Sequence, residues 1–299
     1  MKTTVILMAY GSPTTLEEVP EYLVEIYEGR PVPDYAMKEN MEKYRMVDGV
    51  SPSNAIIDSI VKKLKSRLSR HGDLNVVLGN KHWKPFLKNV VSEMLNDPPE
   101  MIVGIPLFPF PSINVLNSYS LPLREALESL NLHTEVRMVN GLDLNGLADI
   151  WAGIIKGMHP SDGEAILLDA HSLPTFRNPE PEYDNAFKTI SGIIAGKIGV
   201  DTYYRGYQSI GKYGNSWLGP TVYDQFKKIQ ENGHTSVLAA PIGFLYEHLE
   251  VLYDLDLEFG KETVLKSGLG YRRTPLPDSS ESIVNLLEME TIKALGGSE

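Results

Sequence analysis

Short apolar runs alternate along the chain with longer stretches in which apolar residues recur at helical spacing. The apolar runs predict strands at residues 5–9, 74–78, 101–108, 134–139, 165–170, 202–207 and 236–240, with a weak strand or an extended loop at 264–269. The helical spacing predicts helices at residues 15–27, 37–46, 56–68, 83–95, 115–130, 144–158, 184–198, 220–230, 245–256 and 280–295. Such regular alternation is typical of parallel sheets with helices on both faces.

The predicted strands fall into two sets, one before residue 140 and one after residue 164. We therefore predict an α/β protein with two Rossmann-like domains, each a doubly wound, four-stranded parallel sheet. Residues 1–142 would form the first domain and residues 143–278 the second, with a closing helix in 279–299 packing back on the first. Polar and proline-rich turns follow strands in both halves, which predicts a cleft between the domains. A single eight-stranded barrel is the competing architecture.

Composition and charge narrow the classes of function. The 299 residues carry a formal net charge of −11, which disfavours nucleic acid as a partner because phosphate binding needs a basic surface. Cysteine is absent, so disulfides, iron–sulfur clusters and thiolate zinc sites are excluded. Any metal ion must therefore be held by nitrogen and oxygen ligands.

The amino-terminal residues have only a superficial likeness to a signal peptide. Their apolar run, residues 5–9, is too short, and no small-residue cleavage site follows it. No stretch of the chain approaches the length of a membrane span. We therefore expect a cytoplasmic protein without a transmembrane segment, and we expect it to be a monomer.

Two stretches carry candidate chemistry. The apolar run 165–170 ends in His171 and then a turn, which predicts a buried parallel strand that delivers an imidazole to its carboxyl end, where open α/β sheets bind ligands. Farther along, Glu250 lies on a predicted helix. Imidazole and carboxylate are suitable ligands for Fe²⁺, and both groups can pass protons on. We predict that His171 and Glu250 face each other across the cleft, although a strand-end histidine with only a hydrogen-bonding role is about as common.

Three acidic residues follow one another at a spacing of four. Glu250, Asp254 and Glu258 would share one face of a helix, where they repel one another and reduce its stability. A sequence that keeps such a row has a use for it, and we predict a path for protons or metal that leads from the site through Asp254 and Glu258. An additional divalent metal ion on these acids is a second use. A solvated acidic face is the simpler alternative.

Several motifs, in order along nearly the whole chain, resemble the ferrochelatase family. The most specific are Ala-His-Ser-Leu-Pro at 170–174 and His-Leu-Glu-Val-Leu-Tyr-Asp at 248–254. The supporting motifs are Met-Ala-Tyr-Gly-Ser-Pro at 8–13, Gly-Val-Ser-Pro at 49–52, Gly-Tyr-Gln-Ser at 206–209, Trp-Leu-Gly-Pro at 217–220 and Pro-Ile-Gly-Phe at 241–244.

The resemblance implies insertion of ferrous iron into a porphyrin, a lyase reaction of haem biosynthesis, with coproporphyrin III as the preferred substrate and protoporphyrin IX as the alternative. Iron is then a substrate, and no organic cofactor is implied. The family's invariant histidine and glutamate correspond to His171 and Glu250. Family members that act on coproporphyrin III have a first-loop tyrosine that approaches the metal from the other face of the macrocycle, and Tyr10 matches it. The porphyrin propionate positions of the family fall on Tyr27, Lys43, Tyr44, Ser51 and Tyr119.

These assignments have structural alternatives. Tyr10 could bond to backbone at a strand end, and Tyr27, Tyr44 and Tyr119 could be packing residues. Ser51 could be a turn residue, and Lys43, which replaces a usual arginine and so loses bidentate geometry, could be solvated. His82 follows a predicted strand, where it could border the cleft and admit or hold porphyrin, or simply bond to its loop.

Three rival functions stay open at this stage. A related chelatase could insert cobalt or iron into a more reduced tetrapyrrole, but such sites usually have two histidines where this chain has His171 and Glu250. A non-catalytic carrier could bind porphyrin or metal with the same two domains. A metal-dependent hydrolase would need a compact cluster of three ligands, which the sequence does not show.

Overall fold

The structure is a computed structural model, and it describes residues 2–175, 180–211 and 216–296. The chain forms two compact units. Unit 1 comprises residues 2–108, 113–142 and 278–296, and unit 2 comprises residues 109–112 and 143–277. Unit 1 is thus assembled from segments on both sides of unit 2 along the chain.

The sheet of unit 1 consists of four parallel strands in the order β2-β1-β3-β4. Their bounds are β1 (Thr3–Ala9), β2 (Leu74–Asn80), β3 (Met101–Pro106) and β4 (Glu135–Met138). Strand β1 is fully buried because neighbouring strands flank it and helices cover both of its faces, which explains its continuous apolar sequence. The chain runs from β1 to β2 on one side and to β3 on the other, so the carboxyl end of β1 lies at a topological switch point.

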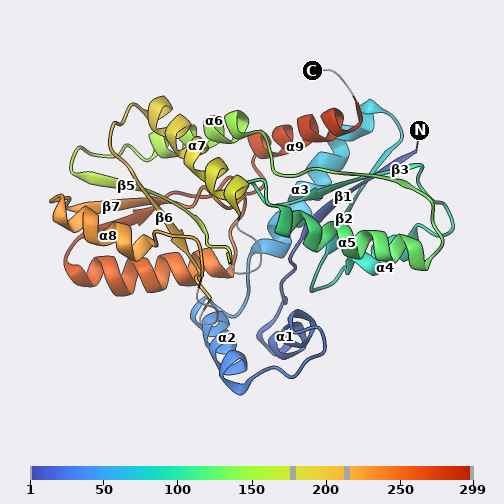
Figure 1. The fold of residues 1–299 in the computed structure, drawn as a ribbon, viewed down its shortest axis with the longest axis horizontal. Helices are drawn as coiled ribbons and strands as arrows, with labels where there is room; N and C mark the ends of the chain where they lie inside the picture. Colours follow the sequence, from blue (N-terminus) through green and yellow to red (C-terminus); the bar gives the residue numbers. More distant parts are fainter. Residues whose placement is uncertain (1, 176–179, 212–215, 297–299) are drawn as a thin grey trace. The chain divides into compact units, whose positions relative to one another are not determined.

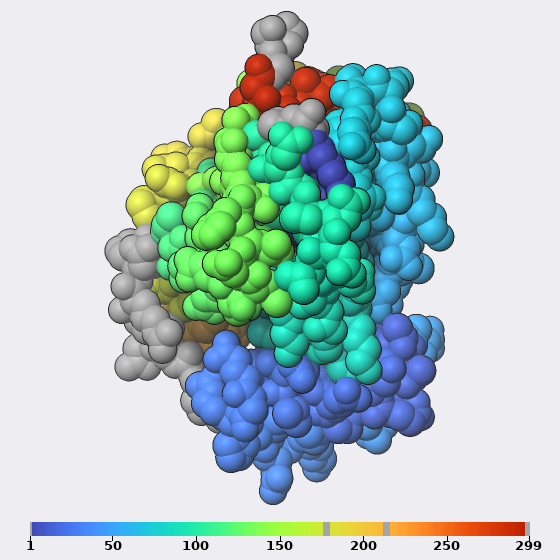
Figure 2. All heavy atoms as spheres, turned by 90° about the vertical axis from the view of Figure 1, so that its right-hand side faces the viewer, coloured from blue at the N-terminus to red at the C-terminus, as the bar shows by residue number. Residues whose placement is uncertain are grey.

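Helices cover both faces of this sheet (Figure 1). The helices of unit 1 are α1 (Val19–Ile26), α2 (Asp34–Met46), α3 (Ser53–Leu68), α4 (Leu87–Glu93), α5 (Ile113–Ser129) and α9 (Glu281–Ala294). Side chains of β1, α4 and α5 form one hydrophobic core cluster, and α3 and α9 pack over the opposite face. Helices α1 and α2 lie together at one end of unit 1, seen as the blue atoms in Figure 2. Proline at the start of α1 fits the first turn, where its missing N–H costs nothing.

Unit 2 repeats the same topology in its own parallel sheet, with the order β6-β5-β7-β8. Its strands are β5 (Glu164–His171), β6 (Tyr204–Gln208), β7 (Ser236–Ala240) and β8 (Gly270–Arg273). The chain goes from β5 to β6 on one side and to β7 on the other. The carboxyl end of β5 is therefore the switch point of this sheet.

The helices of unit 2 include an unusual one. Helices α6 (Leu144–Gly157) and α7 (Pro181–Ile198) lie on one face of the sheet, and α8 (Val222–Glu231) lies on the other (Figure 1). Beside α8 packs a long π-helix, η3 (Val251–Val264), which contributes Leu255, Phe259 and Val264 to the hydrophobic core. Because π-helices are rare and usually short, a helix of this kind points to a functional constraint.

The predicted α/β class and the two four-stranded parallel sheets are confirmed, and the single barrel is wrong because the strands form two separate sheets. The weak strand or extended loop predicted at 264–269 is also wrong: residues 265–267 form a 3₁₀ turn, and β8 follows at 270–273. The helix predicted at 83–95 is shorter, at 87–93. The helix predicted at 245–256 lies later along the chain and is a π-helix. Within the described residues, no helix is long and apolar enough to cross a membrane.

Candidate functional site

His171 is the last residue of β5 and lies at the switch point of the unit 2 sheet. All preceding residues of the strand are buried, whereas the His171 side chain keeps 25% of its surface exposed. Its Nδ1–H donates to the main-chain carbonyl of Ser172, which fixes the ring and leaves Nε2 as the reactive nitrogen. The strand thus presents one imidazole nitrogen at the end of the sheet where ligands bind.

Glu250 lies beside that nitrogen. Its Oε2 is 3.5 Å from Nε2 of His171 and also 3.5 Å from Nε2 of His248, and its side chain is 43% exposed. The ring of Phe244 packs against both imidazoles, with centroid distances of 6.4 Å to His171 and 4.9 Å to His248. Two imidazoles and a carboxylate therefore converge on one partly open point.

The charges of this group are coupled. Burial would lower the pKa of His171, but the Glu250 carboxylate outweighs it and raises the pKa to about 9. Burial would likewise raise the pKa of Glu250, but His171 and His248 hold it well below its usual range. Without a metal ion, the pair at neutral pH is an imidazolium and a carboxylate.

Side chains at the end of β6 hold the start of η3, for which Glu250 is the N-cap residue. Gln208 Nε2 donates to the main-chain carbonyl of Glu250 at 3.3 Å, and Ser209 Oγ donates to Asp254 Oδ2 at 2.5 Å. Ser209 has φ of +58°, a strained conformation for a residue other than glycine. Such strain persists only where its surroundings enforce it, and here it aims the hydroxyl at the π-helix.

The structure separates the members of the acidic row. Asp254 is buried at 8% exposure and bonded to Ser209, whereas Glu258 is exposed. Burial, followed by the Glu258 and Asp254 carboxylates, raises the pKa of Tyr223, which places its phenol near both acids. The role of Asp254 and Glu258 as a path stays a prediction.

Gly243 shows how closely the neighbouring loop packs on β5. A Cβ on Gly243 would lie 2.4 Å from the Cβ of Ala170, and its N–H donates to the Asp169 carbonyl. Only glycine fits there, so the glycine of the Pro-Ile-Gly-Phe motif lets this loop pack directly on the strand that carries His171.

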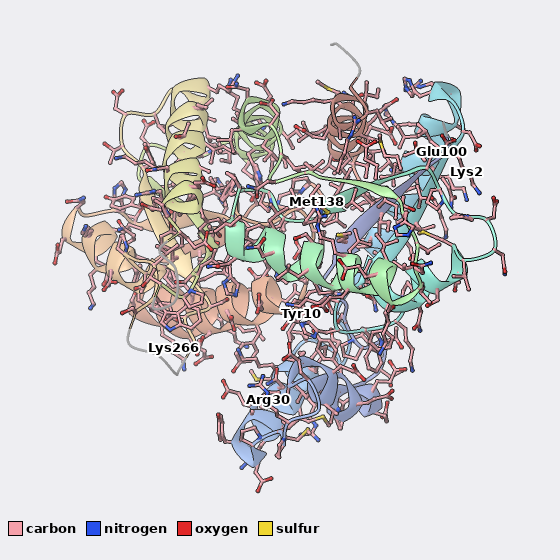
Figure 3. All side chains as sticks on the ribbon, turned by 45° about the vertical axis from the view of Figure 1, so that its right-hand side comes forward. Lys2, Tyr10, Arg30, Glu100, Met138 and Lys266 are labelled. Atoms are coloured by element: carbon pink, nitrogen blue, oxygen red, sulfur yellow. The ribbon has the colours of Figure 1, made fainter. Side chains whose placement is uncertain are left out.

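In unit 1, Tyr10 follows β1 at the corresponding switch point. Figure 3 shows it at one end of the sheet, opposite the end where Lys2 and Glu100 lie. The Tyr10 side chain is 45% exposed, and its ring lies 4.5 Å from that of His82. Gly11 has φ of +88° and lies so close to Trp83 that a Cβ would clash, so this turn requires glycine.

His82 is held as a neutral base beside Tyr10. It is 6% exposed, and its Nδ1–H donates to the Glu25 carbonyl at 3.3 Å. Burial, together with the neighbouring Lys81 cation, lowers its pKa to about 4. At neutral pH the ring is therefore uncharged.

The five expected propionate residues all lie in unit 1. Tyr44 is 2% exposed, with its hydroxyl 3.2 Å from Ser12 Oγ, and Ser51 Oγ donates to Ser53 Oγ at 3.0 Å. Tyr119 belongs to the hydrophobic core cluster of β1, α4 and α5. Tyr27 and Lys43 are half-buried near the carboxyl ends of α1 and α2. These placements show packing roles for Tyr44 and Tyr119, and propionate binding stays a prediction for all five.

The sequence interpretation missed two residues of the site. His248 lies two positions before Glu250 in the same motif, and that spacing was the available signal. Asp169 is completely buried two positions before His171, and neither of its oxygens has a hydrogen-bond partner among the described residues. Burial raises its pKa well above the usual range. The apolar run of β5 gave no sign that an acid inside it would be buried without a hydrogen bond.

No group of three or more His, Asp or Glu side chains in the described part of the chain has the geometry to hold a metal ion. The two histidines and Glu250 supply nitrogen and oxygen donors of the kind that accept Fe²⁺.

Comparisons with known proteins identify the family of this chain. The family model described as Ferrochelatase matches residues 2–294. A ferrochelatase of Thermoplasma volcanium is 41% identical over 291 residues, covering 96% of this chain and 91% of the relative. A coproporphyrin III ferrochelatase 1 of Bacillus thuringiensis is 32% identical over 310 residues, covering 98% and 97%.

Solved structures support the fold. SirB from Bacillus subtilis with Fe³⁺ superposes with a TM-score of 0.60 at 9% identity, covering 98% of this chain and 96% of that one. CbiX, described as the terminal enzyme for siroheme biosynthesis in denitrifying bacteria, has a TM-score of 0.58 at 13% identity, covering 98% and 99%. The match of the family model along nearly the whole length, together with relatives above 30% identity, shows that this chain belongs to the ferrochelatase family.

Proposed function

We propose that this protein is a ferrochelatase that inserts ferrous iron into coproporphyrin III in haem biosynthesis. The observation that carries the proposal is the His171–Glu250 pair at the switch point of unit 2, with 3.5 Å between imidazole nitrogen and carboxylate oxygen. The names of the relatives support the reaction, and the relatives named for coproporphyrin III support the substrate.

Metal insertion requires that iron lose its water and that two pyrrole N–H protons leave the macrocycle. In the proposed mechanism His171 Nε2 and Glu250 replace water on the incoming Fe²⁺. The metal-free pair carries a proton on His171, so binding of iron releases that proton. Once iron has passed to the macrocycle, the two bases are again available to accept the pyrrole protons.

Other residues have supporting roles in this proposal. Tyr10 ligates iron through its phenol oxygen from unit 1, and neutral His82 holds the Tyr10 ring in place. Asp254 and Glu258 lead metal or protons away from Glu250 along η3. Tyr27, Lys43, Tyr44, Ser51 and Tyr119 contact the porphyrin. The protein acts as a cytoplasmic monomer.

The decisive experiment compares anaerobic Fe²⁺ insertion into coproporphyrin III and protoporphyrin IX, with His171→Ala as the control. We expect turnover that prefers coproporphyrin III and is lost in the variant. A preference for protoporphyrin IX would keep the enzyme and overturn the substrate. Porphyrin binding without turnover would favour a carrier. Metal insertion only into sirohydrochlorin would favour the activity of SirB from Bacillus subtilis, which is described as a sirohydrochlorin chelatase.

A further inference from the structure

The main-chain carbonyl of His171 accepts a hydrogen bond from a buried tyrosine. Tyr183, in the first turn of α7, is completely buried, and its Oη donates to the His171 carbonyl oxygen at 2.8 Å. Burial raises the pKa of Tyr183 well above its usual range, so the hydroxyl stays protonated and remains a donor.

This hydrogen bond holds the backbone at the point where the sheet ends. His171 is the last residue of β5 and pairs with Gln208 of β6, and the final main-chain bond across this pair runs from Ser172 N–H to the Gln208 carbonyl. Beyond it the chain leaves the sheet. The orientation of the His171 backbone therefore depends on the Tyr183 hydroxyl as well as on the strand.

The Tyr183 ring is itself fixed by aromatic neighbours. Phe110 is completely buried and lies 5.6 Å from the Tyr183 ring and 5.9 Å from that of Phe187. Phe110 belongs to residues 109–112, which are part of unit 2 although the chain on both sides belongs to unit 1. Rigid packing of this kind lets a hydroxyl hold its acceptor at a constant position.

We propose that Tyr183 is a positioning residue for the iron-handling imidazole of His171, and that Phe110 holds Tyr183 in place. The inference rests on the proposed function, because it assigns Tyr183 a role only if His171 handles the metal. It goes beyond the sequence motifs, since Tyr183 lies outside all of them. Groups that orient metal ligands typically change metal affinity or activity by about 10–100-fold when removed.

The other proposed iron ligand is held in the same way. Gln208 is 3% exposed, and its Nε2 donates to the main-chain carbonyl of Glu250 at 3.3 Å. Both ligands are thus fixed through their carbonyls by buried side chains of other elements. This common arrangement favours positioning over a purely local stabilising bond.

A matched control lies next to Tyr183. Tyr207 is 1% exposed, its ring lies 6.3 Å from that of Tyr183, and its hydroxyl donates to Asp184 Oδ1 at the same distance of 2.8 Å. Tyr207→Phe removes one buried hydroxyl hydrogen bond from the same aromatic cluster but leaves the His171 carbonyl bonded. A merely structural role of Tyr183 predicts equal effects of the two substitutions.

The test compares Tyr183→Phe with Tyr207→Phe in the full chain. We expect Tyr183→Phe to weaken Co²⁺ binding, measured by calorimetry and by the visible spectrum of the bound ion, by about 10-fold or more. The KM for Fe²⁺ should rise and kcat fall, while the KM for porphyrin stays within about twofold. Tyr207→Phe should leave Co²⁺ binding and both KM values within about twofold. Equal values for the two variants would overturn the inference.

Failure of the proposed function gives a different result. If the wild-type protein neither binds Co²⁺ at His171 nor inserts iron, the function fails, and the positioning role fails with it. If the wild type is active and the two phenylalanine variants agree, only the positioning role is wrong. Should Tyr183→Phe not fold, as judged by thermal unfolding, Phe110→Leu decides the matter by the same readouts, because it loosens the ring and keeps its hydroxyl.

Discussion

Tyr10 presents a half-exposed phenol whose ring rests on the neutral imidazole of His82. The two residues emerge from neighbouring strands, and His82 N–H also donates to the Tyr10 carbonyl at 2.9 Å. The Tyr10 ring is therefore placed by backbone and ring contacts. This placement suits a group that contacts iron on one face of a macrocycle.

The phenol oxygen can be removed without disturbing the ring. In Tyr10→Phe we expect ferric coproporphyrin, the oxidised form of the proposed product, to bind with a visible spectrum that lacks the phenol-to-iron charge-transfer band of the wild type. The affinity for metal-free porphyrin should stay within about twofold, because the ring contact persists. Tyr35→Phe, which alters a similarly exposed tyrosine on α2, is the control and should change neither property. Identical spectra for wild type and Tyr10→Phe would remove Tyr10 from the iron-binding group.

The sequence could predict residues at strand ends but not the residues that hold them. His171 was found because an apolar run predicts a buried strand and the switch-point rule places a ligand group at its end. Glu250 was predicted from the acidic row on its helix, and the family resemblance supported it against the alternative of a solvated carboxylate. Tyr183 and Phe110 could not be predicted, since their role depends on packing between segments far apart in the chain.

At the scale of elements, η3 sets the positions of the acids. Its buried residues include both Leu255 and the polar Asp254, so one acid of the row is turned inward and Glu258 outward. Ser209 compensates for the burial of Asp254 by donating a hydrogen bond to its carboxylate. Along the acidic row, Glu250 is therefore partly exposed, Asp254 is buried and Glu258 is exposed to solvent.

If the acids carry metal or protons, their charge matters more than their hydrogen bonds. We expect the double variant Asp254→Asn/Glu258→Gln to raise the KM for Fe²⁺ by about 10-fold, because two negative charges along the path are lost. Ser209→Ala removes the Asp254 hydrogen bond but keeps both charges. It should lower stability by about 1 kcal/mol and leave the KM nearly unchanged. Unchanged KM and turnover in the double variant would assign the acids to the structure alone.

The elements that the sequence misplaced share one physical cause. Apolar spacing over 245–256 predicts an α-helix, but the wider π-helical turn depends on tertiary contacts of Leu255 and Phe259 that no local pattern records. The last strand also begins later than predicted, because residues 264–267 complete the π-helix and form the 3₁₀ turn that precedes β8. Strands with neighbours on both sides, such as β1 and β5, were predicted well because their burial leaves a continuous apolar run.

At the scale of the whole molecule, one ion cluster ties α9 to the rest of unit 1. Glu288 on α9 is 4% exposed and accepts hydrogen bonds from Arg67, Arg70 and His71 at 3.1, 2.7 and 2.9 Å. Burial would raise the pKa of Glu288, but these donors lower it to about 2. The carboxylate therefore contributes to folding only while it is ionised.

This cluster should make stability depend on pH in a defined window. The contribution of Glu288 is complete above its ordinary pKa of 4.5 and is lost as the pH falls through about 2. We expect Glu288→Gln to lower the free energy of unfolding by on the order of 2–3 kcal/mol at pH 7, with the difference shrinking below pH 4. Urea titrations at several pH values measure it. Glu281→Gln, which removes an exposed partner of Arg67, should cost less; an equal cost would contradict the role of burial.

Of the residues, the elements and the whole molecule, the architecture of the whole molecule was predicted best from the sequence. Alternation of strands and helices is a property of the entire chain, so errors of a few residues in single elements do not alter it. The two repeated sheet orders could not be read from the pattern, because strand adjacency depends on which pairs of apolar faces meet. The sheets are confirmed, whereas the residues that bind porphyrin stay predictions.

The late position of α9 in the chain has a consequence for biosynthesis. The protein is made from its amino end, and domains that are complete usually fold first during synthesis. Here residues 2–142 leave the ribosome early but lack the buried side chains of α9, including Ile283, Val284 and Leu287, until all of unit 2 has followed. The last segment of unit 2 is therefore synthesised before the last segment of unit 1, and the apolar surface that α9 covers stays exposed during that interval.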